Sequence, residues 1–258
     1  MNNDRTRQVV NIVATVVVLA INALANALPL NGLNTGEISD RFDVLFVPAG
    51  YVFSIWGVIY LGLIAFMIFQ AMPAQRENPR LRRIGWWYAL GCLANSVWIF
   101  LWHYLQFPLT LVAMLVLLAS LLVIYLRLGI GRAKVGAAEL WAAHVPFSVY
   151  LGWISVATIA NATDVLDYIG WNGWGMAPEA WAVIMLAAAG ILTLLMGLTR
   201  RDAAYALVIA WASAGIALEQ AAASEVVARN AWVLMAVALF VAAASIVRRL
   251  RPAPARRG

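Results

Sequence analysis

Long apolar stretches alternate along this chain with short connections that are rich in arginine or in acidic residues. Each stretch is about 20 residues long, which as a helix crosses the roughly 30 Å hydrocarbon core of a bilayer. Continuous apolar runs favour helices over the alternating strands of an outer-membrane barrel. The pattern therefore predicts an all-α, polytopic membrane protein with about eight transmembrane helices, at residues 8–28, 49–71, 85–105, 108–128, 140–161, 180–198, 203–221 and 230–247.

Composition places the chain in the same class. Hydrophobic residues make up 64% of it, charged residues only 12%, and the mean hydropathy is +0.83, far from soluble averages. The first apolar run has a basic start but no small-residue cleavage site, so we expect it to be a retained helix. No soluble domain is expected.

Charge asymmetry supports the prediction that the seventh run, which is rich in alanine and ends near Glu219, crosses the membrane. Without it the arginine-rich tail would fall outside, against the tendency of basic residues to remain in the cytoplasm. With the N-terminus inside, only Arg41 and Arg229 fall outside. The other basic residues fall on the cytoplasmic side: Arg5, Arg7, Arg76, Arg80, Arg82, Arg83, Arg127, Arg132, Lys134, Arg200, Arg201, Arg248, Arg249, Arg251, Arg256 and Arg257.

This topology predicts that both termini are cytoplasmic, in the inner membrane of a prokaryote. The net charge of +6 then follows from membrane insertion and anionic lipid, and no nucleic-acid partner is expected. The opposite side instead collects acidic residues: Glu37, Asp40, Asp43, Asp164, Asp167, Glu179, Glu219 and Glu225.

Aromatic and polar side chains share helical faces in three of the runs, because residues three, four or seven apart lie on one side of a helix. Asn95 and Asn161 should face the bundle interior, where a helix or a ligand satisfies them. The other reading is that the aromatics form an interfacial belt, for which Tyr51 and Phe53 lie at the right depth, and that the asparagines only join helices. The three faces are Phe53, Trp56 and Tyr60; Asn95, Trp98 and Trp102; and Trp153, Ala157 and Asn161.

Three blocks of residues resemble the TspO/MBR family of tryptophan-rich sensory proteins, which includes the peripheral-type benzodiazepine receptor, or translocator protein. The second run resembles the opening of the family's second helix, and the third run carries an N-x-x-W pair similar to that of its third helix. The fifth run resembles the family's Pro, Trp-x-x-x-Ala and later Asn. The matching residues are Phe46, Pro48, Tyr51, Phe53, Trp56 and Tyr60; Asn95 and Trp98; and Pro146, Trp153, Ala157 and Asn161.

The resemblance implies a five-helix bundle at residues 1–161, with the loop at 29–48 as a lid over a pocket. Residues 162–179 would connect it to three additional helices at 180–258. Family members bind porphyrins and haem-related tetrapyrroles. The chain departs from the family pattern at Ala49, at Tyr51 and in the shorter Phe53-to-Trp56 interval. The expected ligand-binding residues are Tyr51, Phe53, Trp56, Tyr60, Asn95, Trp98, Trp153, Ala157 and Asn161.

No catalytic motif or metal cluster is evident. Cys92 has no second cysteine with which to pair, and His103 and His144 lie in different runs, where we expect structural roles. We therefore expect a tetrapyrrole-binding sensor or carrier rather than an enzyme, with porphyrin or haem as a ligand and no required cofactor. The partners expected are a planar hydrophobic molecule, the bilayer and a second copy in a homodimer. A porphyrin-degrading enzyme and a transporter of another hydrophobic molecule are the alternatives.

Overall fold

The computed structural model describes residues 2–28 and 30–250, and within these ranges the chain is helical with no strand. The all-α prediction is confirmed. The first group of long helices comprises α1 (Asn2–Ala27), α3 (Ile55–Ala71), α5 (Trp87–His103), α6 (Phe107–Leu128) and α8 (Val145–Tyr168). The second comprises α9 (Pro178–Arg200), α10 (Ala203–Glu219) and α11 (Glu225–Leu250).

Short helices and turns connect the long ones. The segment after α1 contains a 3-10 turn η1 (Leu30–Gly32) and α2 (Thr35–Ser39), and a further 3-10 turn η2 (Gly50–Ser54) leads into α3. At the other end of the molecule lie η3 (Pro73–Gln75), α4 (Pro79–Ile84), α7 (Ala137–Glu139) and the π-helical turn η4 (Leu140–His144). A last 3-10 turn, η5 (Gly173–Gly175), precedes α9.

Every predicted apolar run is a helix in the structure. In the described part of the chain, six helical segments are long and apolar enough to cross a membrane: Asn3–Ala27, Gly50–Ala71, Phe107–Leu128, Ala137–Tyr168, Pro178–Arg200 and Glu225–Leu250. Helices α5 and α10 have 17 residues each, so they are roughly 26 Å long, at the short end for a membrane span. The protein is therefore a multi-pass membrane protein.

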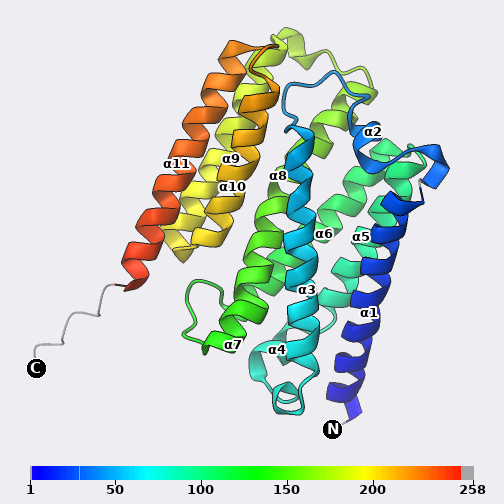
Figure 1. Cartoon of the computed structure of the whole chain (residues 1–258), viewed down its shortest axis with the longest axis vertical. Coiled ribbons are helices and arrows are strands. Elements are labelled where there is room, and N and C mark those ends of the chain that lie inside the picture. The colour runs from blue at the N-terminus through cyan, green and yellow to red at the C-terminus, as the bar shows by residue number, and fades with distance from the viewer. Residues whose placement is uncertain (1, 29, 251–258) are drawn as a thin grey trace, which may run out of the picture.

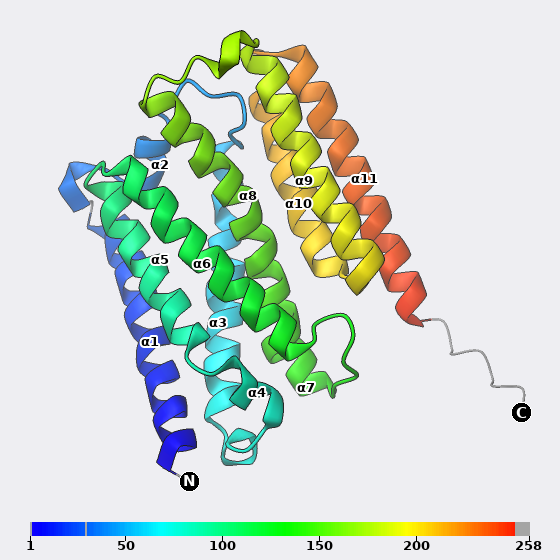
Figure 2. The ribbon, with the colours of Figure 1, turned by 180° about the vertical axis from the view of Figure 1, so that it is seen from behind.

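Figures 1 and 2 show α9, α10 and α11 as a group beside α8, with the remaining helices on the other side of α8. The segment 162–179, predicted as a connection, is partly helical because α8 continues to Tyr168. Helix α1 begins, and α11 ends, at the end of the molecule away from α2. The cytoplasmic placement predicted for Arg251, Arg256 and Arg257 concerns residues outside the described part of the chain.

Helix α10 packs along α8, and contacts near both of its ends join it to the five-helix group. Near its start, the buried carboxylate of Asp202 accepts hydrogen bonds from the hydroxyls of Tyr125 (2.7 Å) and Ser148, on α6 and α8. Near its other end, Gly215 meets η2 so closely that an added Cβ would lie 2.1 Å from Cγ2 of Val52. Only glycine allows this approach, which brings the end of α10 to the entrance of α3.

Candidate ligand-binding site

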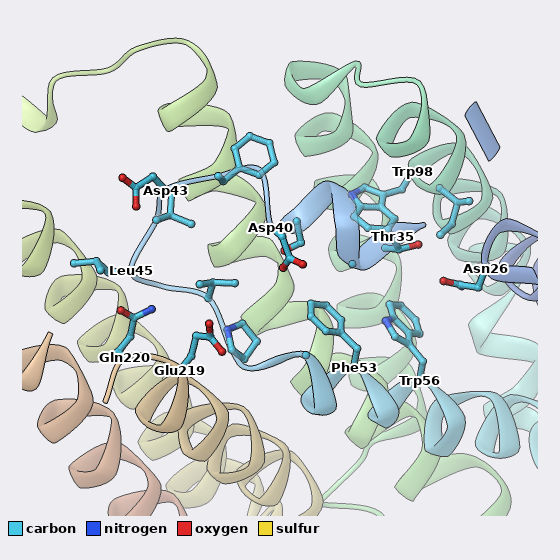
Figure 3. Close-up of a pocket in the computed structure, with 18 of the residues that line it drawn as sticks. Asn26, Thr35, Asp40, Asp43, Leu45, Phe53, Trp56, Trp98, Glu219 and Gln220 are labelled. Carbon is cyan, nitrogen blue, oxygen red and sulfur yellow. The ribbon is translucent and has the colours of Figure 1, made fainter. Parts of the chain in front are cut away.

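A chamber of about 630 Å³ lies at the α2 end of the five-helix group, and we call it the outer chamber. Its size falls within the roughly 300–1,000 Å³ typical of small-molecule sites. One side is formed by the lid, defined here as residues 30–48, whose Thr35, Ser39 and Asp40 line the space (Figure 3). The remaining walls come from α1 (Asn22, Asn26), from η2 and α3 (Gly50, Phe53, Trp56, Tyr60), from α5 (Trp98, Ile99) and from the end of α10 (Glu219, Gln220, Ala223).

A second space of about 70 Å³, the inner chamber, adjoins the outer one. The two share lining residues, among them Phe53, Trp56 and Trp98. The inner chamber adds residues from α5, α6 and α8: Trp102, Met114, Trp153, Val156, Ala157, Ala160, Asn161 and Asp164. It is too small for a large ring system, so the outer chamber offers the room and the inner chamber extends it between the helices.

Aromatic rings form the boundary between the chambers. The Trp153 ring meets Phe53 edge to face at 5.8 Å between centroids and meets Trp56 in the same way at 6.1 Å. Tyr60 stacks on Trp56 at 5.7 Å, and Trp102 stacks on Trp98 at 5.2 Å. Such contacts hold the rings in fixed orientations. The result is a set of flat apolar faces drawn from three helices and η2.

Hydrogen bonds fix the indole of Trp98. Its Nε1 donates to Oδ1 of Asn161 at 3.2 Å, and Nδ2 of Asn161 donates to Oγ1 of Thr110 at 2.8 Å. All three side chains are buried, so the bonds satisfy polar groups that would otherwise be costly in the interior. This connection joins α5, α8 and α6 beneath the outer chamber.

A second buried network joins α1 to three other helices. The hydroxyl of Tyr60 donates to Oδ1 of Asn22 at 3.0 Å, and Nδ2 of Asn22 donates to Oδ1 of Asn95 at 2.7 Å. Asn95 in turn donates to the hydroxyl of Tyr150 at 3.0 Å. The prediction that Asn95 and Asn161 face the bundle interior is confirmed.

The end of α5 holds the lid. Trp102 Nε1 donates to the carbonyl oxygen of Thr35 at 3.2 Å, and Nε2 of His103 lies 3.1 Å from Oγ1 of Thr35. Nδ1 of His103 lies 3.3 Å from the carbonyl oxygen of Leu30. Helix α2 is stabilised locally by a capping box between Asn34 and Glu37. The lid is thus an ordered element with a defined attachment, and the buried His103 contacts two of its residues.

The structure brings seven of the nine expected ligand-binding residues to the chambers: Phe53, Trp56, Tyr60, Trp98, Trp153, Ala157 and Asn161. It does not bring the other two. Tyr51 is 45% exposed and packs edge to face on Trp211 of α10, 5.2 Å between centroids. Asn95 is buried behind the wall, where it holds Asn22 and Tyr150.

The acidic residues of the site and Gln220 were not among the expected ligand-binding residues. Asp40, Asp43, Glu219 and Gln220 line the outer chamber, and Asp164 lines the inner one. Their charge indicated only the side of the membrane on which they lie. The position of α10 against η2, which brings Glu219 and Gln220 to the site, depends on a tertiary contact that the local pattern does not reveal.

No metal site is evident among residues 2–28 and 30–250, where no three His, Cys, Asp or Glu residues are grouped to hold an ion. Cys92 is buried and unpaired. His144 is buried in η4, with Nε2 3.8 Å from Oε1 of Glu139, at the end of the molecule away from the chambers.

Comparison with known proteins gives one match. A family model described as TSPO-like protein matches residues 8–244, a range that includes α9, α10 and most of α11 as well as the five-helix group. No curated protein and no solved structure matches the chain.

Proposed function

Because the chain belongs to the TSPO-like family, we propose that this membrane protein binds a flat hydrophobic small molecule of the tetrapyrrole type and acts as a sensor or carrier for it. The observation that carries the proposal is the aromatic wall between the chambers. Phe53, Trp56 and Trp98 line a space of about 630 Å³, and Trp153 packs on Phe53 and Trp56 from the adjoining inner chamber. Flat apolar faces beside such a space suit a planar ring, and the nearby polar groups can orient it.

The lid supports a role that depends on ligand occupancy. Its residues line the outer chamber on one side, and Thr35 is attached to α5 on the other. A ligand in the outer chamber would contact α3, α5 and the lid together, so its arrival would change the freedom of the lid. A sensor needs such a coupling, and a carrier needs a covered site.

We place the protein in the inner membrane of a prokaryote with both termini in the cytoplasm. The charge distribution supports this orientation. Arg76, Arg83, Arg127 and Arg200 lie in or beside elements at the end of the molecule where α1 begins, whereas Asp40 lies in the lid at the other end. The lid and the outer chamber would then face the outside.

Titration of the purified protein with protoporphyrin IX tests the proposal, with tryptophan quenching and the porphyrin Soret band followed first in the dark and then under illumination. We expect saturable dark binding with one ring per chain and no consumption of porphyrin. Turnover of the ring in the light would favour a porphyrin-degrading enzyme instead. Flux of porphyrin into sealed vesicles would favour the carrier over the sensor, and absence of saturable binding would contradict the proposal.

A further inference from the structure

Among the residues that the structure describes, acidic side chains line both chambers and no basic ones do, and from this we infer that the preferred ligand carries a cationic group. The inference rests on the proposed function, in which the chambers hold a flat apolar molecule, and it narrows the chemical class. The ligand would bear an amine or quaternary ammonium group on its flat body, and a ring with free carboxylates would bind less tightly than the same ring without them.

Three carboxylates line the outer chamber from two separate parts of the chain. Asp40 and Asp43 belong to the lid, and Glu219 ends α10. In Figure 3, Asp40 lies between the lid and Phe53, while Glu219 approaches from the α10 side, away from Trp98. None of the three carboxylates forms a hydrogen bond or an ion pair with any residue that the structure describes.

A fourth carboxylate is buried. Asp164 on α8 is only 7% exposed and lines the inner chamber beside Trp153 and Asn161. Its carboxylate, too, forms no hydrogen bond or ion pair within residues 2–28 and 30–250. An ionised carboxylate is costly to bury without a partner, and a cation that enters the chamber would favour the ionised form of Asp164 over the neutral acid. Asp164 is therefore the strongest single indication of the ligand's charge.

No Lys, Arg or His is among the described residues that line either chamber. Arg41 follows Asp40 in the lid but is not a lining residue. Carboxylates in a cleft with apolar walls focus a negative potential, which raises the local concentration of cations and lowers that of anions.

The aromatic wall suits the same ligand. The face of an indole ring is negative, so it attracts a cation that lies over it, and the attraction is stronger where water is excluded. Trp56 and Trp98 line both chambers, and Trp153 lines the inner chamber with Asp164. The site thus offers indole faces and carboxylates to one cationic group.

Acidic loops at this end of the molecule are also expected from membrane insertion alone, because basic residues are retained at the other end. That rule does not explain the arrangement of the carboxylates. It predicts acidic residues on exposed loops, whereas Asp164 is buried within α8 and Glu219 reaches the outer chamber only because α10 packs on η2 at Gly215.

Three porphyrins that share the same macrocycle but differ in the charge of their side chains test the inference, in purified protein at low ionic strength. They are protoporphyrin IX, its uncharged dimethyl ester, and its bis-amide with terminal dimethylamino groups. We expect the amine to bind roughly tenfold more tightly than the dicarboxylate, with the ester between them. Added salt should reduce this difference, because the outer carboxylates are exposed to solvent.

Charge-neutralising variants then show which carboxylates cause the tighter binding of the amine. Asp164→Asn, and separately the triple variant Asp40→Asn/Asp43→Asn/Glu219→Gln, should weaken binding of the amine several-fold and leave binding of the ester unchanged. The ester also reports whether each variant is folded. Glu179→Gln is the matched control, because it removes one negative charge at the same end of the molecule from a residue that lines neither chamber, and it should leave the preference intact.

Three outcomes would overturn the inference while the proposed binding of tetrapyrroles stands. They are equal affinities for the three porphyrins, tightest binding of the dicarboxylate, and an undiminished preference for the amine in the variants. If no porphyrin binds, naphthyl-trimethylammonium and naphthalene sulfonate take their place as probes. Binding of the cation alone, lost in Asp164→Asn, would support the inference although the tetrapyrrole proposal fails. Binding of neither naphthalene would overturn both.

Discussion

The indole of Trp98 donates a 3.2 Å hydrogen bond to Oδ1 of Asn161, and this buried contact fixes the ring that faces both chambers. Because Asn161 also donates to Thr110, one side chain on α8 sets the positions of α5 and α6. The geometry of the site therefore depends on Asn161, whose side-chain amide is hydrogen-bonded to two other protein side chains.

Replacement of Asn161 by alanine should lower the free energy of unfolding by about 1–3 kcal/mol, because it leaves the Trp98 N–H buried without a partner. Porphyrin affinity should fall as well, since Trp98 is no longer fixed. Thermal unfolding in detergent measures the first effect. Asn230→Ala is the control, because within the described part of the chain the Asn230 side chain bonds only to its own helix. A similar loss of stability in both variants would contradict the account.

Trp56→Ala should weaken porphyrin binding by about 1–3 kcal/mol, the range for loss of a large aromatic contact. Trp56 lines both chambers and carries the stacked Tyr60 ring, so its removal takes away a flat face of the site. Fluorescence titration measures the change. Trp141→Ala is the matched control, because Trp141 is 68% exposed and lines neither chamber. The porphyrin affinity of this variant should equal that of the unmodified protein.

Gly215→Ala should destabilise the protein by about 1–3 kcal/mol, the usual cost of an added methyl group in a closely packed contact. The new Cβ would overlap Val52, so α10 would have to move away from η2. Thermal unfolding and crosslinking between α10 and η2 report the change. The double variant Gly215→Ala/Val52→Ala should recover part of the stability, and no recovery would show that the overlap is not the cause. Gly57→Ala, where an added Cβ meets nothing within 4 Å, serves as the control.

His103→Ala should increase the mobility of the lid. His103 contacts both Thr35 and Leu30, so its removal detaches two points of the segment from α5. Limited proteolysis should then cut residues 30–48 faster, with little change at residues 72–86. Equal cleavage rates in both proteins would mean that the imidazole is not needed to hold the lid, and that the bonds from Trp102 to Thr35 and from Asn31 to the backbone carbonyl of residue 103 are sufficient.

The helices of this protein follow from its hydrophobic pattern, because burial in lipid requires continuous apolar segments with internally bonded backbones. Helical spacing also placed Trp153, Ala157 and Asn161 on one lining face, since those residues lie on a single regular helix. Tyr51 was expected in the site from the family resemblance and not from helical spacing, and it does not line the chambers because its ring packs on Trp211 of α10.

The acidic part of the site could not be predicted in the same way. Asp40 and Asp43 lie in an irregular segment whose path is set by contacts with α5, and Glu219 reaches the chamber only through the packing of α10. These are contacts between elements far apart in the sequence, and no local periodicity encodes them. The buried carboxylate of Asp164 had a signal, its place on the same helix as Trp153 and Asn161, but its charge alone indicates only the side of the membrane on which it lies.

Hydrogen exchange with and without saturating protoporphyrin IX dimethyl ester tests the central claim most directly, because it reports where a ligand lies. A ring in the outer chamber should slow exchange in residues 35–48, at the start of α3 and at the end of α10, and leave α4 unchanged. Protection confined to α4 and α7, or no protection at ester concentrations that saturate the spectroscopic signal, would contradict the account and place the binding site elsewhere.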